Sequence, residues 1–90
     1  MDLVTTTIRA YRQQVEEICY AELTKAMRQL ERGDNARQVL ASFAHIFTNK
    51  LLHVPSVQLR QAGFEGRFDM LQAAQQLFAI PQSELELKLL

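Results

Sequence analysis

Residues 43–55 read Phe-Ala-His-Ile-Phe-Thr-Asn-Lys-Leu-Leu-His-Val-Pro and dominate the fold prediction. With Val39 and Leu40, their apolar side chains form one broad stripe at helical spacing: Phe43, Ile46, Phe47, Leu51 and Val54. Leu52 projects to the opposite side, so we expect this helix to have neighbours on two sides. The pattern predicts a buried helix from about Ala36 to His53. Pro55 ends it, because proline disfavours helical geometry in the residue before it.

The segment that precedes this helix predicts one long helix, because residues 3–32 contain no proline and no glycine. Apolar residues recur from Val4 to Leu30, with a slip of one position at Cys19, and Glu22 is expected on the solvated side. At 1.5 Å per residue the helix is about 45 Å long. Its abrupt start suggests a cut through a longer helix, and an N-terminal cap by Asp2 is the alternative.

A tight turn connects these two helices at Arg32-Gly33-Asp34-Asn35. Gly33 suits the left-handed residue after a helix, and Asp34 or Asn35 suits the cap of the next one. So short a connection predicts a helical hairpin. In that hairpin Leu23, Met27 and Leu30 are expected to pack against Val39, Leu40 and Phe43.

The rest of the chain predicts two shorter helices and a tail. Pro55 suits the first turn of a third helix through Ala62, after which Gly63 and Gly66 bracket a loop. A fourth helix is expected over residues 68–79, ending before Pro81. In residues 83–90 leucines alternate with charged residues, as in a strand. We expect a disordered or irregularly packed tail there, and a helical continuation or pairing with another chain remains open.

The composition does not favour a nucleic-acid or membrane surface, because ten basic and ten acidic residues cancel. Five arginines could form a local basic patch for RNA, although a solvated face explains them more simply: Arg28, Arg32, Arg37, Arg60 and Arg67. No transmembrane or secretory segment is recognised. The single cysteine, Cys19, suits a small buried side chain in a reducing compartment, so the cytoplasm is the expected location.

The sequence shows no recognisable arrangement of catalytic or metal-binding residues. His45 and His53 lie eight residues apart, too far for a metal-binding pair on one helix, and His53 is interpreted as a residue favoured near a helix end. We predict no catalytic, cofactor-binding or metal-binding residue. Lys50 falls inside the apolar stripe, so its ammonium group either reaches water along its stem or pairs with an acid such as Glu65 or Asp69, within the chain or across subunits.

The central block also carries a resemblance. Residues 47–56 read Phe-Thr-Asn-Lys-Leu-Leu-His-Val-Pro-Ser, with Leu59-Arg60 following, and the block is similar to one in the C-terminal dimerisation domain of glutamyl-tRNA reductases. Further similarity extends from Ile8-Arg9 through Leu30-Glu31-Arg32-Gly33 to Gln61-Ala62. Phe47 replaces a usual leucine, and residues 63–66 replace a more polar stretch, which weakens the match in the third helix.

The pattern of the residues already predicts an all-α fold, with a long N-terminal helix followed by a short helical bundle. Its drifting first stripe and its two-sided second helix would leave too much apolar surface exposed in a monomer, so a symmetric homodimer is expected to complete it, and the resemblance implies the same. It also implies that residues 1–32 end a spinal helix and that residues 33–90 form the dimerisation domain. Such enzymes reduce glutamyl-tRNA with NADPH to open tetrapyrrole biosynthesis. Their catalytic and nucleotide-binding domains match nothing here, so Cys19 is not their nucleophile and no cofactor is expected in this fragment.

The expected dimer interface or shared core combines the apolar positions of the predicted helices, and Lys50 is a possible interface charge. Those positions are Leu23, Met27, Leu30, Val39, Leu40, Phe43, Ile46, Phe47, Leu51, Leu52, Leu71, Leu77 and Phe78. Two alternatives stay open. One is a module that contacts tRNA, and the other is a docking platform for a regulatory protein.

Overall fold

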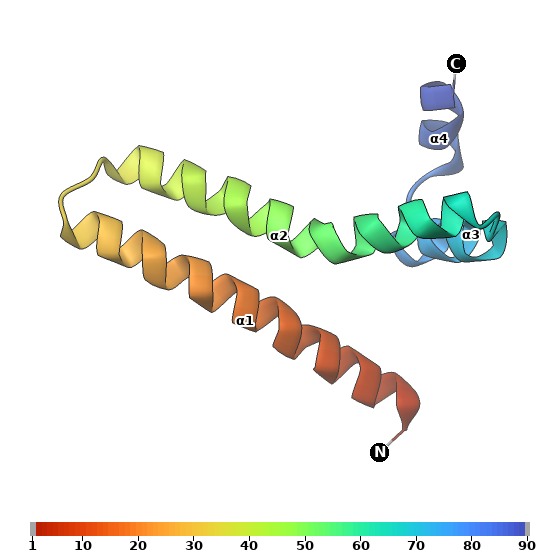
Figure 1. The fold of residues 1–90 in the computed structure, drawn as a ribbon, viewed down its shortest axis with the longest axis horizontal. Coiled ribbons are helices and arrows are strands. Elements are labelled where there is room, and N and C mark those ends of the chain that lie inside the picture. The colour runs from red at the N-terminus through yellow and green to blue at the C-terminus, as the bar shows by residue number, and fades with distance from the viewer. Residues whose placement is uncertain (1, 90) are drawn as a thin grey trace. The chain divides into compact units, whose positions relative to one another are not determined.

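All the elements that the computed structural model describes are helices (Figure 1); it covers the backbone of residues 2–89 and the side chains of residues 2–86. Helix α1 spans Leu3–Glu31, α2 spans Ala36–Phe64, α3 spans Phe68–Leu77 and α4 spans Gln82–Leu89. The chain forms two compact units, Met1–His53 and Val54–Leu90, and α2 runs from one into the other. The predicted all-α fold with a long first helix is confirmed.

The first unit is the predicted hairpin, and its helix ends are set by local chemistry. Asp2 caps α1, because its Oδ1 accepts a 2.7 Å hydrogen bond from the Thr5 amide. Gly33 follows α1 with a φ of 93°. The Asp34 amide donates to the Gln29 carbonyl at 3.0 Å, which closes the helix end in a Schellman motif. Asn35 then caps α2 through a 3.0 Å bond from the Gln38 amide.

Helix α2 corrects the prediction that Pro55 separates two helices, because it continues through Pro55 to Phe64. A proline inside a helix removes one amide donor, here the partner of the Leu51 carbonyl, and crowds that carbonyl. The helix tolerates this loss because the following turns bury apolar side chains of the second unit, among them Ala62, which is 3% exposed. His53 therefore lies inside a helix and not at its end.

The loop predicted between two glycines is shorter than expected. Gly63 belongs to α2, and only Gly66, with a φ of 71°, has the left-handed backbone of a turn. Helix α3 then begins at Phe68 and ends at Leu77, within the range predicted for a fourth helix. Ala79 follows with a φ of 53°, so α3 ends in the same kind of motif as α1 but with a residue that carries a Cβ.

The tail is the helix α4 and not the disordered or irregular segment that we expected; Leu90 lies outside the described residues. The amides of Glu84 and Leu85 both donate to the Pro81 carbonyl, at 3.1 and 3.4 Å, which starts the helix. Glu84 lies in the first turn, where its negative charge interacts favourably with the positive end of the helix dipole. Leucine, glutamate and lysine are good helix formers, and their propensity prevails over a two-residue alternation that finds no strand to pair with among residues 2–89.

Candidate functional site

The two helices of the first unit meet along a narrow seam. Ala26 of α1 and Val39 of α2 are buried there, with exposed fractions of 6% and 5%. Both side chains are small, so the helices can approach closely and little room remains between them for larger groups. Phe43 and Phe47 stack one turn apart on α2, with ring centroids 5.9 Å apart. Burial in the single hairpin therefore depends mainly on small side chains.

A buried glutamate, Glu22, sits in the same seam. It is 4% exposed, and its Oε1 accepts hydrogen bonds from Lys50 Nζ at 2.6 Å and from Lys25 Nζ at 3.2 Å. Lys50 thus forms a cross-helix ion pair, as we considered, although its partner is Glu22 and not Glu65 or Asp69. Our placement of Glu22 on the solvated side was wrong. The missed signal is its spacing, because Glu22 lies one helical turn before the buried Ala26.

The ion pair shifts the protonation of both partners. The hydrogen bond from Lys50 lowers the pKa of Glu22, which burial partly opposes and Lys25 reinforces. In turn the hydrogen bond to Glu22, and the charge of that carboxylate, raise the pKa of Lys50. The seam therefore holds the carboxylate of Glu22 and the ammonium group of Lys50 in their charged forms. This ion pair is a structural link between the two helices.

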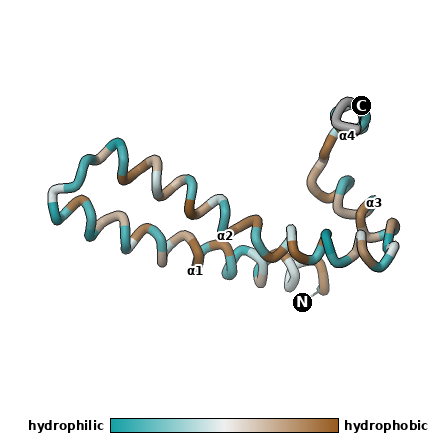
Figure 2. Tube along the Cα trace, turned by 45° about the horizontal axis from the view of Figure 1, so that its top comes forward, coloured by the Kyte–Doolittle hydropathy of each residue, from teal (hydrophilic) through white to brown (hydrophobic). Residues whose placement is uncertain are grey.

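Hydrophobic residues recur along both helices of the hairpin (Figure 2). Most of the predicted interface residues are exposed to solvent in one chain. Our expectation that three leucine and methionine side chains of α1 are buried inside the hairpin is wrong. They are 39% (Leu23), 52% (Met27) and 41% (Leu30) exposed. The predicted set divides as follows: Val39 is buried; Phe43, Phe47, Leu51 and Leu71 are half-buried; Leu40, Ile46, Leu52, Leu77 and Phe78 are exposed.

The second unit contains an apolar groove between the last turns of α2 and helix α3. Its volume is about 430 Å³, and it is lined by Pro55, Gln58, Leu59, Met70, Ala73, Ala74, Leu77 and Phe78. Two of these, Leu77 and Phe78, belong to the predicted interface set. The other residues were missed because the sequence prediction placed a helix break at Pro55. The packing of the last turns of α2 against α3 was therefore not predicted.

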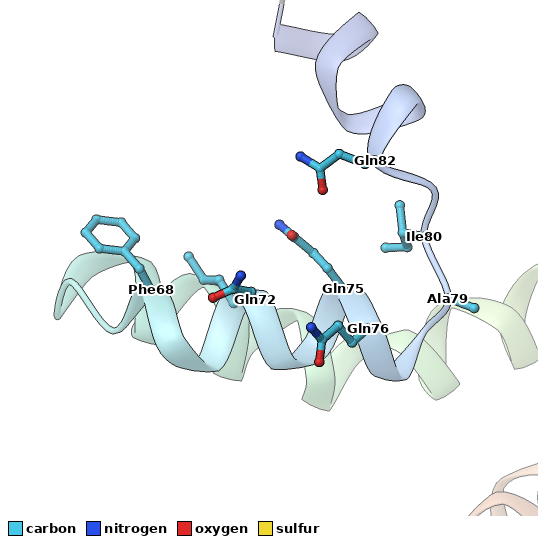
Figure 3. Close-up of a pocket in the computed structure, with 8 residues that line it drawn as sticks. Phe68, Gln72, Gln75, Gln76, Ala79, Ile80 and Gln82 are labelled. Carbon is cyan, nitrogen blue, oxygen red and sulfur yellow. The ribbon is translucent and has the colours of Figure 1, made fainter.

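A second hollow in this unit, of about 470 Å³, lies along α3 and the segment that follows it. Figure 3 shows glutamine side chains around it, from Gln72, Gln75, Gln76 and Gln82, with Phe68 at one end. Amides can donate and accept hydrogen bonds, but they neither titrate nor attack a substrate near neutral pH. The hollow therefore has no acid, base or nucleophile in its lining.

The remaining candidates for chemistry stay isolated. Among the side chains that the structure describes, those of residues 2–86, no group of three or more histidine, cysteine or acidic residues could hold a metal ion. Cys19 is half-buried and forms no disulfide. His45 contacts Asn49 one turn away, through Nε2 at 3.1 Å. None of the helices described here is long and apolar enough to cross a membrane.

The arginines that could have formed a basic patch are partly neutralised. Arg32 Nη2 lies 2.6 Å from Asp34 Oδ2, and Arg67 Nη2 lies 3.4 Å from Asp69 Oδ2. Each of these pairs lies within two residues along the chain, at the edge of a turn. Paired charges attract phosphate weakly, so this arrangement favours the solvated-face interpretation.

Comparison with known proteins offers an explanation for the exposed apolar residues of the hairpin. Residues 3–80 match the family described as glutamyl-tRNAGlu reductase, dimerisation domain. The chain belongs to this family. It is 51% identical over 79 residues to the glutamyl-tRNA reductase of Pseudomonas savastanoi pv. phaseolicola, a match that covers 88% of this chain. The resemblance recognised in the central block is thereby confirmed.

Other members of the glutamyl-tRNA reductase family are similarly related. The protein of Pseudomonas putida strain F1 is 51% identical over 79 residues, which cover 88% of this chain. The protein of Pseudomonas fluorescens strain Pf-5 is 53% identical over 73 residues, which cover 81%. The chain spans only 17–19% of the length of these relatives. No solved structure matches the chain.

Proposed function

We propose that this chain holds two copies of a glutamyl-tRNA reductase together as a symmetric homodimer. The proposal is supported by the family to which residues 3–80 belong. It agrees with the described residues, which present apolar surface and no constellation of catalytic groups. Isologous pairing is the commonest symmetry of soluble oligomers and needs only one self-complementary patch.

The observation that carries the proposal is the exposure of large apolar side chains on both helices of the hairpin. Met27 is 52% exposed and Leu40 is 61% exposed, although each lies within the apolar pattern of its helix. Monomeric proteins rarely expose contiguous apolar patches of more than a few hundred Å². A second copy removes this surface from water without any further partner.

The reaction belongs to the longer enzyme in this proposal. The relatives are named glutamyl-tRNA reductases, and we extend that activity to the protein in which this chain acts. There glutamyl-tRNA is the substrate, NADPH is the reductant, and the product opens tetrapyrrole biosynthesis in the cytoplasm. We assign none of these steps to residues of this chain.

Neither alternative function gains support from a specific contact. A tRNA-contacting role predicts binding whose affinity falls steeply with salt, because counterions are released from the RNA. The ion pairs of Arg32 and Arg67 argue against a strong phosphate surface. A docking role for a regulatory protein predicts apolar surface that remains exposed on the dimer.

Sedimentation equilibrium of the chain, over a range of protein and salt concentrations, tests the proposal. We expect a dimer whose dissociation constant changes little with salt, because the contact surface is apolar. A chain that stays monomeric at high concentration contradicts the proposal. Titration with a tRNA in the same buffers, at low and moderate salt, separates the dimeriser from a tRNA-binding module.

A further inference from the structure

We infer that the two copies meet through one face of the hairpin in the first unit, here called the apolar face. Its residues are Leu23, Met27 and Leu30 of α1, with Leu40, Phe47 and Leu51 of α2. This inference rests on the proposed function, because it names the surface through which the chain associates. The opposite face of the same hairpin stays in water.

The seam between the two helices fixes the position of this face. Glu22 and Ala26 mark the side of α1 that faces α2, because both are buried, and Glu22 bonds to Lys50 of α2. Val39 and Lys50 mark the corresponding side of α2. Each of these four residues is followed directly by a large apolar residue of the apolar face: Leu23, Met27, Leu40 and Leu51.

A step of one residue turns the side chain by about 100° around a helix. Viewed along one axis, the step runs clockwise in one helix and anticlockwise in its antiparallel partner. Because the two seam sides point at each other, both rotations end on the same face of the two-helix layer. Leu30 lies on this face because it follows Met27 by about one helical turn, and Phe47 lies on it because it follows Leu40 by about two turns.

The residues that directly precede the seam positions lie on the other face and differ in character. They are Ala21, Lys25, Gln38 and Asn49, all exposed, and Arg28, Ser42 and His45 share their side. Lys25 and Ser42 also lie close to each other across the two helices, because both line one small pocket together with Gln29 and with residues in or near the seam: Glu22, Ala26, Phe43 and Ile46. Leu52, which is 53% exposed, is a large apolar residue on this side as well. The hairpin thus has one face built of several large apolar residues and one face that is mainly polar, and the apolar face gains more by leaving water.

The area of the apolar face suits a second copy. The paired part of the hairpin is about 27 Å long at 1.5 Å per residue, and two helices about 10 Å apart are about 20 Å wide. The flat footprint is then about 500 Å², which side-chain relief raises toward the roughly 800 Å² per partner of a standard interface. Two hairpins stacked face to face form a four-helix bundle, with the large side chains at its centre.

None of the six residues of this face carries a charge, so two identical copies do not repel each other through them. Glu22 and Lys50 pair in the seam, and Lys25 contacts Glu22 from the polar face. A partner of different chemistry would also have to present an apolar surface of matching size. A second copy presents one by symmetry, which makes it the occupant that we assign.

The test compares two variants that introduce the same charge on α1. Met27→Glu places a carboxylate on the apolar face, and Ala21→Glu places one on the polar face, both at positions exposed in the single chain. Met27→Glu should raise the dissociation constant of the dimer at least about 1,000-fold, because two unpaired carboxylates are desolvated per dimer. Ala21→Glu should change it less than about threefold. Leu40→Glu, on α2, should weaken the dimer as Met27→Glu does.

Circular dichroism at 222 nm establishes that each variant is still helical, and Met27→Leu should keep the wild-type affinity. If the wild type dimerises and Met27→Glu and Leu40→Glu dimerise equally well, this inference fails while the proposed function stands. If Ala21→Glu dissociates the dimer as strongly as Met27→Glu, the assignment of the face is also wrong. A wild type that is monomeric at every concentration overturns the proposed function itself.

Discussion

Replacing Pro55 with alanine should stabilise the protein, because α2 runs through this position without a break. In a helix interior, proline leaves the carbonyl four residues before it without its amide partner, and the ring presses on that carbonyl. For Pro55 this carbonyl belongs to Leu51. An alanine restores the hydrogen bond and relaxes the contact.

The expected gain can be estimated from two opposing terms. Proline is about 3 kcal/mol less favourable than alanine within a helix. Against this, Pro55 is half-buried in the groove of the second unit, and alanine removes two ring carbons from it, which costs about 1 kcal/mol at half burial. The net gain is about 2 kcal/mol, or a rise in Tm of about 10 °C for a domain of this size.

Thermal unfolding followed by circular dichroism, at one fixed protein concentration, measures this gain. If Pro55 instead opened a separate helix, as the sequence suggested, its rigid φ would be favourable and its loss would cost about 0.4–1 kcal/mol. An unchanged or lower Tm for Pro55→Ala therefore refutes the continuous helix. Pro81→Ala is the matched control, because Pro81 lies between α3 and α4 and should show no gain.

Two further changes test the helix ends and the seam. Gly33→Ala should lower the free energy of unfolding by about 1–2 kcal/mol, because an alanine Cβ opposes its φ of 93° although nothing lies within 4 Å. Ala79→Gly, at the corresponding position after α3, should raise the free energy of unfolding by about 0.5–1 kcal/mol. Urea unfolding measures both changes, and two changes of the same sign would contradict a left-handed residue at the end of each helix. The lowered pKa of Glu22 stabilises the fold above the ordinary glutamate value of 4.5, and this stabilisation is lost as pH falls through the lowered pKa. Tm measured from pH 7 to pH 2.5 should therefore fall more steeply for the wild type than for Glu22→Gln, and parallel profiles would refute the seam ion pair.

The helix ends could be predicted because they depend on a few neighbouring residues. Gly33 follows a long run without glycine or proline, and only a residue tolerant of positive φ closes a helix in this way. Asn35 has the side chain of a cap and is used as one. Both inferences need no knowledge of distant parts of the chain, and both are confirmed.

The break at Pro55 and the disordered tail were wrong because each rule was local and the outcome was not. Proline disfavours a helix by a few kcal/mol, which burial of the next turns around Ala62 can offset. In residues 83–90, only three alternating leucines suggested a strand, and no neighbouring strand exists among the described residues to satisfy one. Helix propensity then decides the conformation.

The site showed the same division between residue type and residue position. The sequence indicated that Lys50 needs an acid or a path to water, and the structure supplies the acid, Glu22, from 28 residues away. The sequence analysis named Glu65 and Asp69 and placed Glu22 on the solvated side, because periodicity alone does not show how far each helix of the hairpin is rotated about its own axis.

That rotation also explains why the large apolar residues lie outside the seam. An apolar stripe wide enough to cover two sides of a helix can face its hairpin partner with either edge. Here the edge with Ala26 and Val39 faces inward, because small side chains let the helices close while Glu22 and Lys50 pair between them. Met27 and Leu40 are consequently turned outward by one residue step each, onto one face. Close approach within one chain and an apolar surface for a second chain thus follow from the same rotation, and a hairpin with its large residues inside would have neither.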